Sequence, residues 1–116
     1  MSFAKKFNTD KAQFTFEPNE NTPFIKPSEL VQTNGIDAVY TLKGCYLNKK
    51  GLYGNEPVLI TETHFVNAPS HLAETITSVL KDENAVKLVN LNKVGFRFYE
   101  YENKYGMQLG IEWVDL

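Results

Sequence analysis

The stretch Lys93–Trp113 (KVGFRFYEYENKYGMQLGIEW) constrains the fold of this 116-residue chain more than any other. Apolar and polar residues alternate along it, and the polar residues 102–104 interrupt the alternation. This pattern predicts two strands joined by a short turn. Side chains of a strand point alternately to its two faces, so each strand can offer one apolar face to a core. The residues expected on those faces are Val94, Phe96, Phe98, Met107, Leu109, Ile111 and Trp113.

The opposite face of the first of these strands has an unusual composition. It presents Arg97, Tyr99 and Tyr101, where a solvated strand usually carries Thr, Lys, Glu or Ser. Flat rings beside a guanidinium are suited to stacking the bases of a single strand. Tyr and Arg are also favoured at protein–protein interfaces. The residues alone therefore leave two interpretations open, a nucleic-acid site and a protein contact.

Length and composition predict one domain over residues 1–116, with residues 1–11 as a flexible arm. No apolar run approaches the ~20 residues that cross a bilayer, and we expect no signal peptide at the N-terminus. Cys45 is the one cysteine, which excludes an intramolecular disulfide and fits a cytoplasmic protein. The formal charge of −2 and the pI near 5.7 argue against coating of nucleic acid by bulk positive charge.

The rest of the chain predicts three more strands and three helical segments. Strands are expected over residues 12–17, 36–48 and 57–66, and one or two helical turns over residues 28–33. A helix is expected to start within residues 67–70 and a second one to span about 83–91. The expected N-caps are Ser28 for the first helical segment, Asn67 or Ser70 for the second and Asp82 for the third. The expected buried positions of the last two helices are Leu72, Ile76, Val79, Leu80, Val86 and Val89.

Gly44 marks a change of phase inside the strand predicted over 36–48. Tyr40 and Leu42 share an apolar face before it, whereas Cys45 and Leu47 form the apolar pair after it. A β-bulge or sharp bend shifts the phase by one residue in this way, and glycine tolerates both. A bent strand can serve both sheets of a small barrel.

The predicted order of elements is three strands, a helical region and two strands. This is the order of the OB-fold, a mainly β, five-stranded Greek-key barrel with a helix between strands three and four. The alternative is an unrelated α+β sheet with helices on one face.

The sequence contains no constellation typical of an active site. No glycine-rich phosphate loop is present, and Glu62 with His64 is more typical of a solvated strand face than of a metal site. His71 is expected in a helix, and Cys45 is more typical of a core residue than of a nucleophile. We therefore expect no catalytic residue, no metal site and no cofactor, so that the protein is not an enzyme.

The residues that favour binding of a single strand combine cations with aromatic rings. Cations neutralise phosphates, and each stacked base contributes ~1–3 kcal/mol. For the two adjacent lysines 49 and 50, a solvated loop is the simpler explanation. The candidate DNA-binding residues are Lys43, Tyr46, Lys49, Lys50, Tyr53, Arg97, Tyr99, Tyr101, Lys104 and Tyr105, with Lys43 and Tyr46 expected to point away from the core.

Four segments of the chain together resemble small single-stranded DNA-binding proteins of phages of lactic-acid bacteria. The segments are FNTDKAQFTFEPNENTPF, NKKGLYGNEPVLI, FVNAPSHLAETI and KVGFRFYEYENKYGMQLGIEWVDL. The resemblance implies an OB-fold, a homodimer and sequence-independent binding of single-stranded DNA. It also implies a role in phage DNA replication or recombination in the host cytoplasm, beside phage replication or recombination proteins, with no membrane partner and no catalytic residue.

Overall fold

The computed structural model describes residues 14–51 and 54–116, and side chains outside residues 49–55. It is a mainly β structure of two sheets with helices. The elements are β1 (Phe24–Ile25), α2 (Pro27–Asn34), β2 (Tyr40–Thr41), β3 (Gly44–Gly51), β4 (Gly54–Ile60), β5 (Phe65–Asn67), a 3₁₀ turn (Ser70–Leu72), α3 (Ala73–Lys81), α4 (Glu83–Asn90), β6 (Val94–Asn103) and β7 (Gly106–Asp115).

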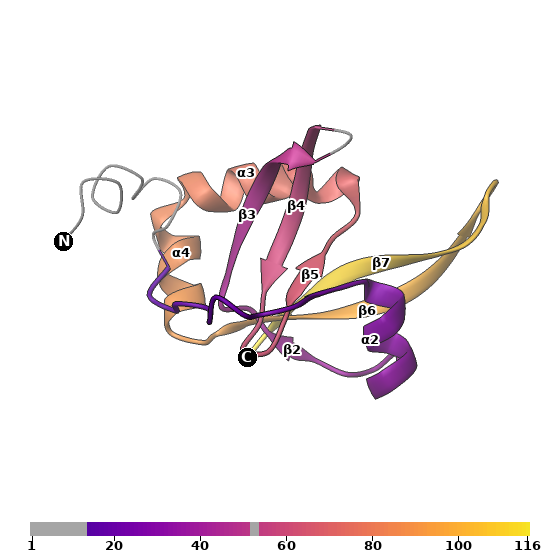
Figure 1. Ribbon diagram of the computed structural model, residues 1–116, viewed down its shortest axis with the longest axis horizontal. Helices are drawn as coiled ribbons and strands as arrows, with labels where there is room; N and C mark the ends of the chain where they lie inside the picture. The colour runs from indigo at the N-terminus through magenta and orange to yellow at the C-terminus, as the bar shows by residue number, and fades with distance from the viewer. Residues whose placement is uncertain (1–13, 52–53) are drawn as a thin grey trace.

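The two sheets share one core between them. One sheet has the strand order β1-β5-β4-β3 and the other the order β2-β6-β7, and every pairing except β1 with β5 is antiparallel. In Figure 1, β3 and β4 run up the picture while β6 and β7 run across it, and the β6–β7 hairpin extends beyond the rest of the fold.

The chain passes from one sheet to the other between Leu42 and Lys43. The Leu42 N–H donates to the Val94 carbonyl of the β6 sheet at 2.9 Å, and the Lys43 N–H donates to the Ile60 carbonyl of the β4 sheet at 2.8 Å. Leu42 and Cys45 are three residues apart, so in a straight strand they would point to opposite faces. Both are buried, which confirms the predicted bend between them. The strand itself begins at Tyr40, four residues later than predicted.

Counting residues 40–51 as one bent strand gives a Greek-key order. This bent strand pairs with β6 on one side and with β4 on the other, and β5 lies next to β4. This is the spatial order 4-1-2-3 of a Greek key, with the helices in the long connection between its third and fourth strands. Among the described residues β5 and β7 do not pair, and β1 takes the free edge of β5. The predicted closed five-stranded barrel is therefore not confirmed.

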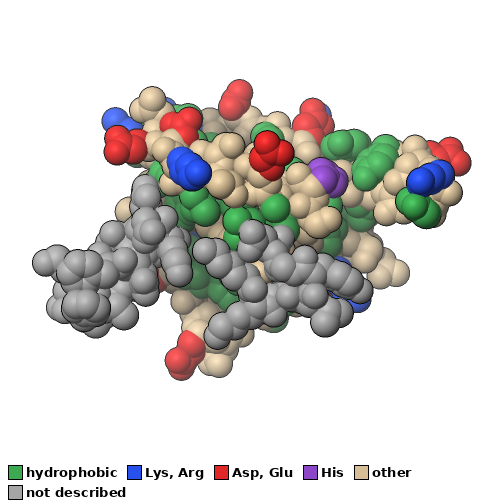
Figure 2. Space-filling view, turned by 90° about the horizontal axis from the view of Figure 1, so that it is seen from above, with side chains coloured by type: hydrophobic (Ala, Val, Ile, Leu, Met, Phe, Trp, Pro, Cys, Tyr) green, Lys and Arg blue, Asp and Glu red, His purple; other side chains and the backbone are tan. Residues whose placement is uncertain are grey.

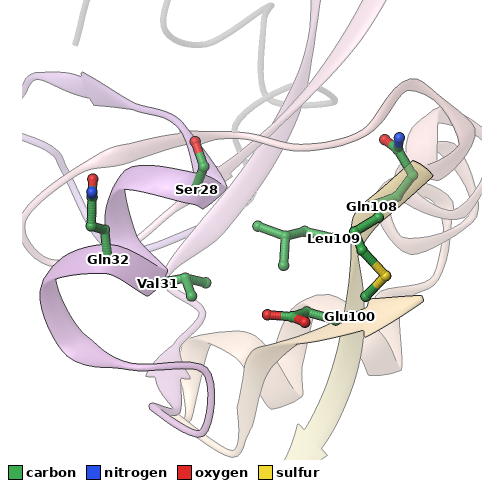
Figure 3. A pocket seen from close by; sticks show the side chains of 7 residues that line it. Ser28, Val31, Gln32, Glu100, Gln108 and Leu109 are labelled. Atoms are coloured by element: carbon green, nitrogen blue, oxygen red, sulfur yellow. The ribbon is translucent and has the colours of Figure 1, made fainter. Parts of the chain in front are cut away.

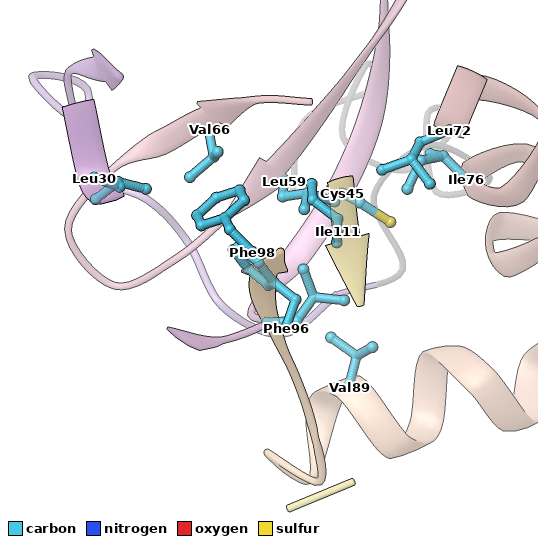
Figure 4. Packing of buried hydrophobic residues seen from close by; sticks show 11 residues of the cluster. Leu30, Cys45, Leu59, Val66, Leu72, Ile76, Val89, Phe96, Phe98 and Ile111 are labelled. Carbon is cyan, nitrogen blue, oxygen red and sulfur yellow. The ribbon is translucent and has the colours of Figure 1, made fainter. Parts of the chain in front are cut away.

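The core lies where the two sheets and the helices meet (Figure 4). Of the hairpin residues predicted to be buried, Phe96, Phe98 and Ile111 lie in it, whereas Met107 and Trp113 stay exposed. Those two were predicted wrongly because the hairpin extends past the core at one end and runs along its rim at the other. The buried cluster comprises Leu30, Leu42, Cys45, Leu59, Val66, Leu72, Ile76, Val89, Phe96, Phe98 and Ile111.

The two later helices form close to where their sequence places them. The Asp82 carboxylate accepts the N–H groups of Asn84 at 3.0 Å and Ala85 at 3.2 Å, so it caps α4 as predicted. The other predicted caps are wrong. Helix α2 begins at Pro27, whose fixed φ suits the first helical position, rather than after Ser28.

The start of α3 has no side-chain cap. Asn67 belongs to β5, and neither it nor Ser70 accepts a capping hydrogen bond, because a 3₁₀ turn precedes the helix. Of the positions predicted to be buried in these helices, Leu72, Ile76, Val86 and Val89 are confirmed. Val79 and Leu80 are only partly buried, where they pack against the core.

The strand predicted over residues 57–66 is two strands separated by a turn. The Thr61 hydroxyl accepts the N–H groups of Thr63 at 3.3 Å and His64 at 3.0 Å. This local turn competes with strand pairing, as Thr side chains can do. Glu62 and His64 therefore lie in a turn rather than on one strand face.

The described part of the strand predicted over residues 12–17 is not a strand. The Thr15 N–H donates to the Asn90 side-chain oxygen at 2.9 Å instead of to a neighbouring strand. The Phe14 ring packs over Gly44, where an added Cβ would lie 3.1 Å from it. The alternation of Phe14 and Phe16 thus reflects side-chain docking without a backbone ladder.

Candidate nucleic-acid interface

The outer face of β6 carries the three residues that the sequence singled out. Arg97, Tyr99 and Tyr101 lie opposite Glu112, Gly110 and Gln108 of β7, respectively. The rings of Tyr99 and Tyr101 are neighbours, with centroids 5.8 Å apart and planes tilted by 42°. The predicted alignment of these side chains on one face is confirmed.

The guanidinium of Arg97 is already paired with a carboxylate. Its Nε donates to Glu112 Oε2 at 2.9 Å, and both side chains are about half exposed. This hydrogen bond and the attraction between the charges raise the pKa of Arg97 and lower the pKa of Glu112. A phosphate approaching Arg97 would meet a neutralised pair rather than a free cation.

The hairpin turn places Lys104 and Tyr105 at its tip. The tip is a two-residue turn over residues 104–105, closed by the pair Asn103 and Gly106, whereas the predicted turn covered residues 102–104. Gly106 has a φ of 102°, which glycine adopts without strain, and the Asn103 side chain accepts the Tyr105 N–H at 2.8 Å. Tyr105 is 77% exposed, and the Lys104 ammonium lies 5.1 Å from its ring centroid. Both side chains are available to a ligand.

Lys43 is tied to the protein surface instead of standing free. Its ammonium donates to the Asn92 side-chain oxygen at 2.7 Å, lies 3.4 Å from a Glu62 carboxylate oxygen and lies 5.8 Å from the Phe16 ring centroid. The side chain is 13% exposed. The side chain points away from the core, as predicted, but its charge is already neutralised within the protein.

A second aromatic cluster lies on the outer face of the other sheet. The Tyr46 ring meets the Phe65 ring edge-on at 6.2 Å, and Phe65 lies 5.0 Å from Phe24, which is 52% exposed. Burial raises the pKa of the Tyr46 phenol above its ordinary value. The sequence indicated Tyr46 but missed both phenylalanines. For Phe65 the available signal was the run 57–66, whose two faces are both apolar and so gave no phase.

The two aromatic surfaces lie on opposite sides of the core. Cys45 and Phe98 both point into that core, so Tyr46 and Tyr99, each next in sequence, point away from it on different sheets. The structure therefore does not unite the predicted residues in one groove. Lys49 and Lys50 lie in β3, but their side chains, like the whole of Tyr53, fall outside the described residues.

Charges of both signs are interspersed on the described surface. Figure 2 shows acidic and basic side chains scattered over the face seen from above, without an extended basic patch among the coloured residues. This distribution agrees with the formal charge of −2. Attraction of a phosphate backbone must then come from individual cations near a binding surface rather than from a charged face.

A shallow pocket of about 410 Å³ separates α2 from the β6–β7 hairpin (Figure 3). Among its described lining residues, Glu100 is the one carboxylate. Val31 and Leu109 face each other across the opening in Figure 3. The remaining lining residues are Ser28, Gln32, Met107 and Gln108.

The groups considered for metal or nucleophilic chemistry are dispersed. Cys45 is buried, and burial raises the pKa of its thiol to about 12, which keeps it protonated at neutral pH. The His64 Nδ1 lies 2.8 Å from the Thr63 hydroxyl. Within the described residues no group of three or more His, Cys, Asp or Glu side chains gathers into a metal-binding cluster.

Comparisons with protein-family models, with characterised proteins and with solved structures found no match to this chain. Among the described residues, none of the helices has the length and apolar character needed to cross a membrane.

Proposed function

We propose that this protein binds single-stranded DNA without sequence preference and without chemistry on the DNA. The observation that carries the proposal is the ring cluster of Phe24, Phe65 and Tyr46 on the outer face of the β1-β5-β4-β3 sheet. Phe24 is exposed, while Tyr46 and Phe65 are partly buried beside it. Every base has a π-face, so rings on the outer face of a sheet can accept bases whatever their identity. Phe24 is half exposed and does not belong to the core, so its ring is free to stack on a base.

The position of this cluster in the fold supports the proposal. We interpret the fold as an open form of the five-stranded OB barrel, in which residues 40–51, β4, β5, β6 and β7 are the five strands in order. Four of the antiparallel pairings of that arrangement are present. OB-folds bind oligonucleotides on the face of strands two and three, between the loops that follow strands one and four. Those strands are β4 and β5 here.

By the same correspondence, we propose that the candidate loop residues contact the same single strand. In the sequence, Tyr53 lies between the first and second of these strands, close to Lys49 and Lys50, and the turn after strand four holds Lys104 and Tyr105. We propose that these lysines contact phosphates, since single strands need cations to replace their counterions. Lys43 is less suited to this task because Glu62 already neutralises it.

We propose that the biological setting is the one that the resemblance to phage single-stranded DNA-binding proteins implies. It comprises DNA replication or recombination of a phage in the cytoplasm of its host, with phage replication or recombination proteins as partners.

The proposal is tested by fluorescence anisotropy of a labelled oligo-dT titrated with protein, against a duplex of equal length. We expect binding to the single strand that weakens with salt, with a slope of about −0.7 per phosphate contacted, and little binding to the duplex. Absence of binding to oligo-dT at low salt would refute it.

A second candidate function is a protein-interaction module that uses the β6 face. The ion pair of Arg97 with Glu112 favours it, because a neutralised arginine beside Tyr99 and Tyr101 suits a protein contact better than a phosphate backbone. Size-exclusion chromatography of Tyr101→Ala separates the two functions. Loss of an oligomer with oligo-dT binding intact assigns the β6 face to protein contacts.

A further inference from the structure

Strand β7 is a ten-residue edge strand whose outward backbone groups lack partners among the described residues. The Leu116 N–H donates to the Lys93 carbonyl at 2.9 Å, and bonded and non-bonded pairs alternate along an antiparallel ladder. Even-numbered residues of β7 therefore bond to β6, and the odd-numbered ones turn their backbone groups outward. Within the described structure no hydrogen bond reaches these groups, and no element other than β6 packs extensively along β7.

The exposed edge of β7 lacks the features that usually prevent strand addition. Its sequence, GMQLGIEWVD, contains no lysine, arginine or proline. By contrast, β3, at the edge of the other sheet, carries two lysines and a shift of register between Asn48 and Gly51. Lysines and irregularities of this kind protect an edge, and a long regular edge without them favours pairing with another strand.

We propose that β7 pairs antiparallel with β7 of a second copy of this chain, around a twofold axis at Gly110. Two apolar side chains of β7 remain exposed on the face that leads to the core, Met107 at 59% and Trp113 at 36%. They are equally far from Gly110 in sequence, so this axis places each Met107 opposite Trp113 of the other copy. Sulfur–aromatic contacts of this kind are favourable. Leu109 then lies opposite Ile111 of the second copy.

The composition of β7 favours this register over axes at Ile111 and Glu112. With the axis at Gly110, Glu112 faces Gln108 of the second copy, which can donate a hydrogen bond to it. An axis at Glu112 would set that carboxylate against its own copy, and like charges directly opposite each other are destabilising. An axis at Ile111 would place the exposed Met107 against Asp115. Of these three registers, the one centred on Gly110 gives the best complementarity.

The proposed axis also accounts for a glycine in the middle of β7. Gly110 would face Gly110 of the second copy in a close, non-hydrogen-bonded pair. The ring of Tyr99 covers each glycine, since a Cβ added to Gly110 would lie 2.4 Å from Tyr99 Cζ. Two tyrosine rings would then meet over the axis on the outer face. The inference does not depend on DNA binding.

Disulfide cross-linking tests both the pairing and its register. Gln108→Cys and Glu112→Cys place thiols on facing, non-hydrogen-bonded positions about 4.5 Å apart at the Cα atoms, which a disulfide can span. We expect oxidation of a mixture of the two single variants to give a covalent dimer of one chain of each. Each variant alone should give far less, because its two thiols would be separated along the strand by about 13 Å. The native Cys45 is buried, so the wild type serves as the control for background cross-linking.

Absence of the mixed dimer, or equal cross-linking by either variant alone, overturns the proposed register. The association itself is tested by light scattering coupled to size exclusion. We expect the wild type to be a dimer, Leu109→Pro a monomer and Leu109→Ala still a dimer. Proline and alanine both remove the leucine side chain, but only proline removes the outward N–H, and edge strands tolerate it.

Circular dichroism verifies that Leu109→Pro remains folded. A monomeric wild type, or equal dimerisation of Leu109→Pro and Leu109→Ala, overturns pairing through this edge. If Leu109→Pro does not fold, the cross-linking experiment decides alone.

Discussion

The ring of Tyr99 lies over Gly110 of the neighbouring strand, so close that any side chain at position 110 would displace it. A ring packed over a glycine compensates for the missing side chain, a device known from other sheets. This relationship assigns Tyr99 a structural role in addition to any role in binding.

The packing of Tyr99 on Gly110 predicts non-additive effects on stability. Gly110→Ala should destabilise the fold by about 1 kcal/mol, because the tyrosine must leave its preferred rotamer. In a Tyr99→Ala background the same change should cost nothing, since alanine is otherwise preferred to glycine inside a strand. Urea denaturation of the two single variants, the double variant and the wild type gives the coupling energy. Additive effects would show that the ring does not rest on the glycine.

The ion pair of Arg97 and Glu112 predicts a pH dependence. The pKa of Glu112 is below its ordinary value in the folded protein, so its contribution is present above the ordinary glutamate pKa of about 4.3. That contribution is lost as the pH falls through the folded pKa. The stability difference between wild type and Glu112→Gln should therefore be constant near neutral pH and disappear in acid.

Thermal melts of both proteins between pH 7 and pH 3 measure this difference. The pair is solvent-exposed, so added salt should also reduce it. A difference that persists at pH 3 and in high salt would mean that Glu112 acts through packing instead of charge.

Lys43 should matter for stability more than for DNA. Lys43→Ala removes a charged hydrogen bond to Asn92 and should cost about 1.5 kcal/mol. The salt slope of oligo-dT binding should not change, because Glu62 already neutralises the ammonium. Urea denaturation and anisotropy at several salt concentrations measure the two effects. A slope reduced by about 0.7 would instead assign Lys43 to a phosphate.

Local sequence signals were enough to predict the helices and the hairpin. Contacts between residues far apart in the sequence could not be predicted in this way. Asp82 caps a helix through bonds to residues two and three positions away, so its sequence context sufficed. The pairing of Arg97 with Glu112 depends on the turn. A turn centred on residues 102–104 implies another register, and the observed turn at 104–105 brings the two residues opposite each other. The misplaced turn therefore gave Arg97 no acidic partner in the predicted register.

The aromatic cluster on the other sheet was hidden for a different reason. Phe24 and Phe65 are 41 positions apart and meet through the parallel pairing of β1 with β5. Parallel pairing of two short strands leaves no signature within either one. The Thr61 turn also resembled a strand, because threonine is common in strands, until its hydroxyl was seen to accept local N–H groups.

The most discriminating prediction concerns Phe24. Phe24→Ala should weaken oligo-dT binding by about 1–3 kcal/mol if a base stacks on its ring. The side chain is 52% exposed, so the fold should lose little stability. Leu91→Ala is the matched control, since Leu91 is 54% exposed at the end of α4 and lies outside the aromatic cluster. Anisotropy titrations should separate the two variants. If Phe24→Ala and Leu91→Ala bind oligo-dT as tightly as the wild type while Tyr99→Ala binds it more weakly, the single strand binds the β6 face instead.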